Sequence, residues 1–311
     1  MSALICGSLA YDTIMVFPDQ FKNHILPDKV HILNVSFLVP RMRREFGGCA
    51  GNIAYNLKLL GGNPVPMATV GQDFGPYREH FVECGIPLGQ VKELGDLFTP
   101  QAFITTDLDN NQITAFHPGA MMRSYENHVR DVEGVEFGIV SPDGREGMLQ
   151  NAEEFRAGGV PFIFDPGQAM PLFNGEELRH FVELADYVTV NDYESNLLQE
   201  RTGWSEADIA SRVKAYITTC GPKGAKIHAD GKTLDVAPAH ERRITDPTGC
   251  GDAFRAGLIH GIMKGYDWMT IGRIGNLMGA LKVEHPGTQN QRFDYRQFAD
   301  QFRQQFGYAL D

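Results

Sequence analysis

The chain has 311 residues, of which 42% are hydrophobic and 22% charged, and this composition predicts a globular α/β protein with a large buried core. Its formal net charge of −11 excludes the basic surface of a nucleic-acid binder, and no apolar run reaches the ~20 residues of a membrane span. The five cysteines form no CxxC pair, so we expect a reduced, cytoplasmic protein without a zinc site and with no membrane partner.

The N-terminal part of the chain alternates between extended and helical patterns. A buried strand is predicted over residues 1–7, and short extended pieces, such as 31–39, within residues 12–46. A glycine pair then precedes a helical pattern in which apolar side chains recur three and four residues apart, at Ile53, Leu57 and Leu60. A further strand at 66–70 and a helix near 77–84 continue the strand–helix rhythm.

Residues 101–117 depart from this rhythm. Two short β-prone runs, 102–106 and 113–116, flank a polar turn over 107–112, which predicts a hairpin. Together with residues 12–46, this hairpin is expected to form a small sheet standing off the main body.

The second half returns to strand–helix units, which predict a mostly parallel sheet with helices on both faces. In such a fold, ligands bind at the carboxyl ends of the strands. The predicted strands of this half are 138–140, 161–164, 187–190 and 215–219.

The most informative segment is Thr245–Phe254, which leads into a strongly apolar helix. Gly249 and Gly251 let the backbone approach an anion closely, and the first helical turn offers unpaired N–H groups and partial positive charge. Asp252 would repel a passively bound phosphate, but it suits a base that accepts a proton from an attacking hydroxyl. The pattern therefore favours phosphoryl transfer.

Two glycine-rich segments allow other interpretations. The Gly-x-Gly-Asp pattern could be a loop with a capping aspartate, whereas a dinucleotide-binding turn is excluded because Phe254 stands where its third glycine would be. Gly231-Lys232-Thr233 resembles the end of a phosphate-binding loop, but Lys226 replaces the first glycine. We interpret Asp230-Gly231 as a hairpin turn.

Four segments resemble motifs of the ribokinase/PfkB family of sugar and nucleoside kinases: 47–52, 191–194, 219–224 and 246–254. Peripheral segments such as 202–208 are similar to bacterial adenosine kinases of the actinobacterial type. The resemblance implies a ribokinase-like three-layer sandwich with a small β lid, through which such proteins often form homodimers. It places the core at residues 1–11, 47–100 and 121–311, and the lid at 12–46 and 101–120.

The resemblance also implies an activity, namely ATP-dependent phosphorylation of the ribose 5′-hydroxyl of a purine nucleoside, with adenosine converted to AMP. ATP and Mg²⁺ would be required, with K⁺ as a further candidate. A sugar kinase of the ribokinase or fructokinase type is the first alternative, and a catalytically silent nucleoside-binding sensor is the second. The aromatic lid side chains argue against the sugar kinase, and Asp252 argues against the sensor.

Carried over position by position, the resemblance makes Asp252 the catalytic base and the amides of Gly249, Cys250 and Gly251 the anion hole. Contacts to the nucleoside are implied for Ser8, Asp12, Gly48, Asn52, Phe103, Phe116 and Gln168. Contacts to ATP are implied for Asn191, Thr219, Gly221, Gly224 and Asn276.

Metal sites are implied at two further acidic residues. Glu194 would organise Mg²⁺ through water, and Asp246, with carbonyls near Thr248 and Gly287, would hold a monovalent cation. Plainer roles stay open for several of these positions, since Asp12 could cap a turn, Glu194 could be a solvated helix residue, and the lid aromatics could be packing.

Two positions depart from the family pattern. Ala169 replaces a second glutamine of the actinobacterial enzymes, which weakens the assignment of adenosine over another purine nucleoside. Cys250 stands where the family often has alanine or valine. Its place at a helix N-terminus predicts a lowered thiol pKa, so that alkylation or oxidation would block catalysis. The alternative is a small residue that fills space.

Overall fold

The computed structural model describes residues 2–25, 34–109 and 111–310, and every structural statement below concerns these residues. Its main sheet has nine strands in the order β13-β12-β11-β10-β9-β8-β1-β4-β5, of which β12 and β13 are antiparallel and the others parallel. The strands are β1 (Ser2–Cys6), β4 (Asn63–Gly71), β5 (Val91–Leu94), β8 (Val135–Val140), β9 (Phe162–Phe164), β10 (Tyr187–Asn191), β11 (Ala215–Thr219), β12 (Ala225–Ala229) and β13 (Lys232–Val236).

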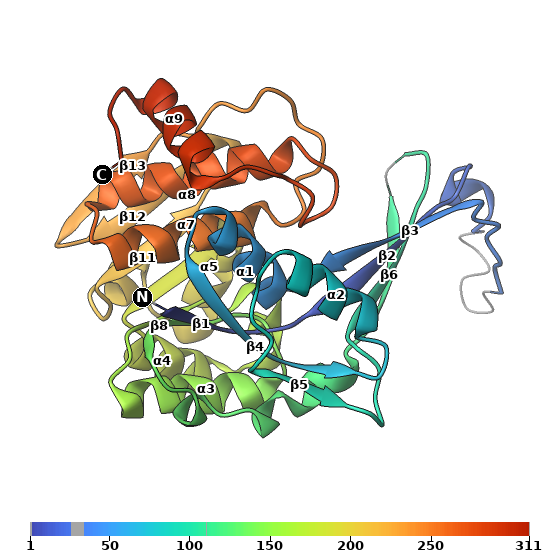
Figure 1. Cartoon of the computed structure of the whole chain (residues 1–311), viewed down its shortest axis with the longest axis horizontal. Coiled ribbons are helices and arrows are strands. Elements are labelled where there is room, and N and C mark those ends of the chain that lie inside the picture. Colours follow the sequence, from blue (N-terminus) through green and yellow to red (C-terminus); the bar gives the residue numbers. More distant parts are fainter. Residues whose placement is uncertain (1, 26–33, 110, 311) are drawn as a thin grey trace.

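Helices cover both faces of this sheet (Figure 1). One face carries α1 (Cys49–Leu59), α2 (Gly75–Glu83), α7 (Cys250–Lys264) and α8 (Trp268–Val283), with α9 (Tyr295–Phe306) packed outside α8. The other face carries α3 (Arg145–Gly158), α4 (Gly175–Leu184), α5 (Asp192–Thr202) and α6 (Glu206–Ala210). Short 3₁₀ turns lie at Phe21–Asn23, Gly119–Glu126, Val129–Asp131, Gly167–Leu172 and Gly221–Lys223.

The side chains of β1 explain the layered arrangement. Ala3 and Ile5 pack into the core beneath α1 and α7, whereas Leu4 and Cys6 pack into the core beneath α3 and α4. Successive side chains of a strand point to opposite faces, so a strand that is apolar at consecutive positions needs cover on both sides. The predicted α/β fold with a mostly parallel sheet is confirmed. Among the described residues, no helix has the length and hydrophobicity needed to cross a membrane.

A second, four-stranded sheet has the order β3-β2-β6-β7 and projects from one end of the core (Figure 1). Its strands are β2 (Ala10–Val16), β3 (Arg41–Gly47), β6 (Gln101–Thr106) and β7 (Gln112–His117). The prediction of a small separate sheet with a hairpin near 101–117 is therefore confirmed. The division of the chain into core and lid segments stays a prediction.

The predicted extended piece at 31–39 does not form a strand where the structure describes it. Residues 34–39 lie outside the strands, and residues 31–33 lie outside the described part of the chain. The apolar Phe37 packs against Phe17, with ring centroids 4.7 Å apart, and the strand begins only after Pro40. Phe37, one of the apolar residues that suggested a strand, is therefore packed against Phe17 instead of pairing in a sheet.

The hairpin turn predicted at Asp230-Gly231 is confirmed between β12 and β13. Both residues have positive φ, 52° and 69°, as the tightest hairpin turns require. The main sheet also has a topological switch, since β1 lies between β8 and β4, and the chain extends the sheet first on one side and later on the other. Ligand sites in open α/β sheets form at the carboxyl ends beside such a switch.

Candidate active site

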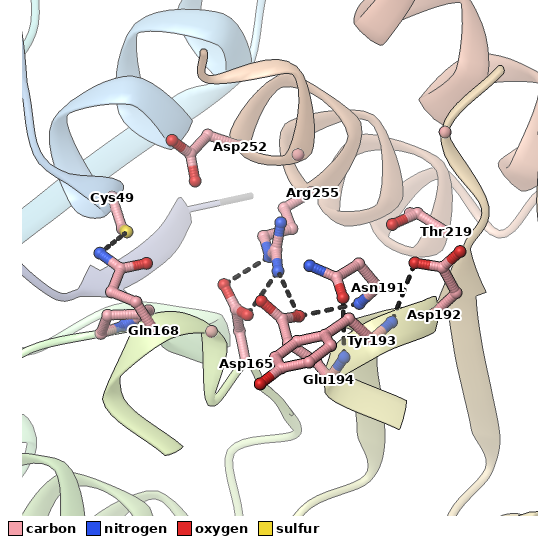
Figure 2. Close-up of a pocket in the computed structure, with 14 residues that line it drawn as sticks. Cys49, Asp165, Gln168, Asn191, Asp192, Tyr193, Glu194, Thr219, Asp252 and Arg255 are labelled. Atoms are coloured by element: carbon pink, nitrogen blue, oxygen red, sulfur yellow. Dashed lines mark hydrogen bonds and ion pairs between the residues drawn. The ribbon is translucent and has the colours of Figure 1, made fainter. Parts of the chain in front are cut away.

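A cavity of about 350 Å³ opens at the carboxyl ends of the parallel strands (Figure 2). Residues that follow β9, β10 and β11 form one wall, and the first turn of α7 forms another. In Figure 2, Asp252 and Cys49 lie on one side of the view and Thr219 and Asp192 on the other, with Arg255 between them. The lining residues are Cys49, Pro142, Asp165, Gly167, Gln168, Asn191, Asp192, Tyr193, Glu194, Thr219, Gly221, Gly251, Asp252 and Arg255.

The start of α7 has the backbone geometry expected of a phosphate nest. Gly249 is the N-cap with φ of 79°, and a Cβ there would approach Thr288 Cγ2 to 3.0 Å. A side chain at this position would therefore strain the turn. Of the three amides predicted to form the anion hole, that of Cys250 donates to the Pro247 carbonyl at 3.1 Å, whereas Gly251 lines the cavity.

Asp252 lies in the first turn of α7 and lines the cavity. Its Oδ2 accepts a hydrogen bond of 2.8 Å from Asn52 Nδ2 of α1. Burial raises the pKa of Asp252, while Arg255 and Asn52 oppose this shift. A raised pKa makes a carboxylate a better proton acceptor than an exposed aspartate would be. The position of Asp252 in the cavity is compatible with the predicted role of a base, and that role stays a prediction.

A buried chain of hydrogen bonds fixes the Asn52 amide. Gln289 Nε2 donates to Asn52 Oδ1 at 3.0 Å and to the Tyr77 hydroxyl at 2.7 Å, while Gln289 Oε1 lies 2.9 Å from His80 Nε2. Because the Asn52 oxygen is engaged, its nitrogen is turned toward Asp252. Asn52 was predicted to hold the ribose, and the structure adds this orienting contact. The sequence did not indicate this contact of Gln289, because Gln289 and Asn52 are far apart in the sequence and meet only in the folded chain.

Arg255 is the functional side chain that sequence reasoning missed most clearly. It is 8% exposed, and it forms ion pairs with Asp165 through Nε and through Nη2, the latter 2.6 Å from Oδ1. Its Nη2 also lies 4.0 Å from Glu194 Oε2. Burial lowers the pKa of Arg255, but Asp165, Asp252 and Glu194 together raise it above the ordinary value. The available signal was a charged residue one helical turn after Asp252 on an otherwise apolar helix.

The nucleotide side of the cavity begins at α5. Asn191 is its N-cap and exchanges hydrogen bonds of 2.8 Å with Glu194, whose carboxylate accepts from the Asn191 N–H. Thr219 and Gly221, at the end of β11, also line the cavity. The described residues hold no group of three or more histidine, cysteine or acidic side chains placed to bind a metal ion. Mg²⁺ is usually held by one or two carboxylates, water and substrate phosphates, and Glu194 fits that mode.

On the side of the lid, Asp12 of β2 is partly buried. Burial, followed by Asp252 and Glu45, raises the pKa of Asp12 to about 6. Gly48 has φ of 84°, and a Cβ there would lie 2.5 Å from the Ser8 carbonyl oxygen, so the turn into α1 needs glycine. The Ser8 hydroxyl accepts from the Cys49 N–H at 3.3 Å and does not line the cavity.

Of three further residues predicted to contact the nucleoside or ATP, one lines the cavity and two do not. Gln168 lines the cavity, and its Nε2 lies 3.7 Å from Cys49 Sγ. Asn276 donates to the Val236 and Ala237 carbonyls at 3.2 and 2.9 Å, and Gly224, with φ of 92°, shapes the turn after β11. Neither Asn276 nor Gly224 lines the cavity. Their contacts to ATP stay predictions.

The two lid aromatics lie on opposite faces of the small sheet. Phe116 pairs with Ala102 and Phe103 with Ala115, and residues directly opposite in antiparallel strands share a face. Ala102 in turn pairs with Asp12, so Phe116 shares the face of Asp12. The two rings of one lid therefore do not face a ligand from the same side of the sheet, and their contacts to the nucleoside stay predictions. Phe116 is the one placed to face a ligand held by Asp12.

The predicted reactivity of Cys250 is not supported. Burial raises the pKa of its thiol to about 11. The prediction of a lowered pKa is not supported, because desolvation is the largest influence on this half-buried thiol and the carboxylates of Asp246 and Asp252 add to it. Cys49, which also lines the cavity, has its pKa raised well above the ordinary value by burial. Neither thiol is a ready thiolate.

The predicted monovalent cation site has unexpected partners. Asp246 accepts from the Thr248 and Gly287 N–H groups through its two carboxylate oxygens, both at 2.9 Å. Its backbone carbonyl accepts from Lys282 Nζ at 2.7 Å, and the His285 carbonyl does so at 3.3 Å. A potassium ion at these carbonyls would lie beside a buried ammonium of like charge. The residues present therefore do not fit a bound potassium ion.

Comparison with known proteins agrees with this geometry. A family model described as pfkB family carbohydrate kinase matches residues 11–293. The chain is 52% identical to a nucleoside kinase of Burkholderia thailandensis, whose structure in complex with inosine aligns over 99% of both chains with a TM-score of 0.90. It is 32% identical over 320 residues to a nucleoside kinase of Methanothermobacter thermautotrophicus, covering 98% of this chain and 96% of that protein. A ribokinase of Thermotoga maritima, 19% identical, covers 97% and 99% of the two chains with a TM-score of 0.81, which confirms the predicted ribokinase-like fold.

Proposed function

The chain belongs to the pfkB family of carbohydrate kinases and is a phosphotransferase, and we propose that it transfers the γ-phosphoryl group of ATP to the ribose 5′-hydroxyl of a purine nucleoside. The observation that carries the proposal is Asp252, which lines one cavity together with Gly251 of the α7 nest and with Asn191 and Thr219 at the strand ends. Acceptor and donor would thus meet at a single carboxylate. Use of ATP agrees with the cytoplasmic location expected from the sequence.

Asp252 is the general base of this proposal. One of its oxygens is held by Asn52, and within the described residues the other has no hydrogen-bond partner. That second oxygen can accept the proton of the 5′-hydroxyl as the hydroxyl oxygen attacks the γ-phosphorus in line. The Asn52 hydrogen bond and the packing of α1 against α7 keep the carboxylate from rotating away. Positioning of this kind is a large part of catalysis of phosphoryl transfer.

Positive charge around the transferred group would come from the first turn of α7, from Arg255 and from a Mg²⁺ ion held by Glu194. The first turn of α7 contributes its partial positive charge, and Gly251 brings the backbone close to the phosphate. The Arg255 guanidinium also lines the cavity, where its charge is partly offset by its ion pair with Asp165. Glu194 would hold Mg²⁺ through water, and the ion when bound neutralises charge on the phosphates.

Asp12, Gly48 and Asn52 would hold the ribose hydroxyls, with Phe116 packed on the base from the lid. Closure of the lid would exclude water, which otherwise competes for the phosphoryl group. Gln168 is proposed to contact the base. Its amide can donate and accept, so it can pair with the edge of adenine or of hypoxanthine.

Adenosine, converted to AMP, is the substrate favoured by the sequence motifs, and inosine is the ligand of the Burkholderia relative. Selectivity for adenosine alone would need a second directional contact to the base, and Ala169 cannot supply one. We therefore extend the proposal to both purine nucleosides. The same reasoning ranks free sugars below nucleosides, because a sugar leaves Phe116 and Gln168 without a partner.

The predicted homodimer would use the other face of the lid. Met42, Phe103 and Ile113 share that face in the strand register and are 70%, 40% and 43% exposed. Apolar side chains gathered on one sheet face are typical of an interface. Light scattering of the wild type and of Met42→Lys tests this, since a dimer that uses this face should dissociate in the variant.

A coupled ADP-release assay tests the proposed activity. Adenosine, inosine, guanosine, cytidine, ribose and fructose are compared at equal ATP and Mg²⁺. We expect the highest kcat/KM for purine nucleosides, a lower value for cytidine and the lowest values for the two sugars. A higher value for ribose or fructose would support the sugar kinase alternative, and no ADP release with any of the six would support a binding role.

A further inference from the structure

Lys282, near the C-terminal end of α8, carries a charge that the chemistry described above does not use. Its side chain is 0% exposed, and its Nζ donates to the carbonyls of Asp246 and His285. Within the described parts of the chain, the hydrogen-bond partners of this ammonium are these two backbone carbonyls and not a carboxylate. A buried ammonium is costly unless it is well coordinated, so this arrangement needs an explanation.

The two carbonyls belong to the turns that support the start of α7. One turn, 246–249, leads directly into the nest, and the other, 285–288, packs behind it. Asp246 joins them, because its carboxylate accepts from the N–H groups of Thr248 and Gly287. Thr288 in turn lies against Gly249, the N-cap of α7. Lys282 therefore binds both turns at once and does not line the cavity.

We propose that the Lys282 ammonium takes the place of a monovalent cation in this kinase, so that phosphoryl transfer needs no K⁺ and Lys282 is a positioning residue for the α7 nest. Backbone carbonyls beside a carboxylate are the ligands that a hard monovalent cation would use, and here a tethered cation already neutralises them. Burial lowers the pKa of Lys282, while the nearby carboxylates of Asp246 and Asp252 oppose this shift and favour its charged form. A lysine ammonium is compact, so it can serve as a point charge where an ion would otherwise sit.

The inference rests on the kinase activity proposed above, but not on which nucleoside is used. It predicts that wild-type kcat is the same in K⁺, Na⁺ and tetramethylammonium at equal ionic strength. Lys282→Met keeps the volume and removes the charge, and its kcat should fall about ten- to a hundredfold through misplacement of the nest. Lys282→Ala also leaves space, so it should lose activity similarly and recover part of it with K⁺ or ammonium ions. Lys264→Met, at an exposed position of the same sheet face, is the matched control and should behave as the wild type.

A readout that does not depend on turnover separates this idea from the activity. K⁺ should raise the thermal midpoint of Lys282→Ala relative to tetramethylammonium and leave that of the wild type unchanged. Full activity of a folded Lys282→Met, or a wild type that is activated or thermally stabilised by K⁺, would overturn the inference. A wild type that transfers no phosphoryl group in any cation, yet shows the expected thermal pattern, would instead overturn the proposed function alone.

Discussion

The start of α7 and the small β lid, which we propose to act on one substrate, differ in how their side chains are held. Around Asp252, hydrogen bonds between side chains fix the polar groups. Asn52 donates to Asp252, Gln289 donates to Asn52, and Arg255 pairs with Asp165. In the lid, the hydrogen bonds of Asp107 hold the turn between β6 and β7, but all six residues of β7 are exposed and the Phe116 ring is 53% exposed. One region is fixed before the substrate arrives, and the other can complete its contacts only with a ligand.

This contrast separates chemistry from selectivity. A preorganised charge does not have to be reoriented during the reaction, so changes near α7 should lower kcat. A lid side chain that contacts the substrate equally in ground and transition states should change KM instead. The predictions below test that division, beginning with the largest effect.

Replacement of the base should have the largest effect. Asp252→Asn keeps the size of the side chain and an oxygen to accept from Asn52, but it cannot take a proton. We expect kcat to fall by ~10²–10⁴ with nearly unchanged affinity for nucleotide, measured by steady-state assay and calorimetry. Asp235→Asn, at an exposed position of β13, is the control. A variant with most of its turnover intact would show that the rigid region does not hold the base.

Removal of Arg255 should affect both stability and pH dependence. Arg255→Met leaves Asp165 buried and unpaired, so unfolding free energy should fall by about 3–5 kcal/mol. The double variant Arg255→Met/Asp165→Asn removes both charges and should recover much of that loss in denaturant titrations.

The single variant Arg255→Met also reports on the electrostatics of the base. Arg255 is the largest influence that lowers the pKa of Asp252, so without it that pKa rises further. Activity requires the ionised base and is lost as pH falls through its pKa. The acidic limb of kcat should therefore move to higher pH in Arg255→Met, and an unchanged limb would refute the coupling.

Disruption of the hydrogen-bond chain should have an intermediate effect. Gln289→Leu leaves the Asn52 oxygen unpaired, so the amide is free to turn away from Asp252. We expect kcat to fall about tenfold, equivalent to ~1.4 kcal/mol in the barrier. Gln289→Glu, which keeps an oxygen for His80 but loses the donor to Asn52, should resemble the leucine variant. Full activity in both variants would show that Asn52 orients Asp252 without the hydrogen bond from Gln289.

The smallest effects are expected in the lid. Phe116→Ala should raise the KM for a purine nucleoside about two- to tenfold with little change in kcat. Phe103→Ala is the matched comparison, because the same substitution on the opposite face should leave KM unchanged. Equal effects from both variants would contradict the assignment of faces.

A feature could be predicted from the sequence when its interacting residues are close together in the chain, and not when they are far apart. Gly249, Gly251 and Asp252 are neighbours in one segment, and their roles in a helix N-terminus can be inferred from local physical chemistry. Arg255 pairs with a residue 90 positions away, and Gln289 with one 237 positions away, so their partners could not be recognised from the sequence.

The features that the sequence did not indicate have the same cause. The opposite faces of Phe103 and Phe116 depend on strand register, which the hairpin pattern did not determine. The raised pKa of Cys250 depends on desolvation by surrounding elements, and the position of Lys282 depends on how α8 ends beside two loops. Local rules described the helix terminus correctly but not its surroundings.

The pH dependence of kcat tests the identity of the base most directly, because the site contains a rival. Asp12 has its pKa raised to about 6 and could by itself produce an acidic limb. Saturating assays are run across pH for the wild type, Asp12→Asn and Asp252→Asn. We predict that the acidic limb persists in Asp12→Asn and disappears from the residual turnover of Asp252→Asn. A limb that persists in Asp252→Asn and disappears in Asp12→Asn would contradict the assignment of Asp252.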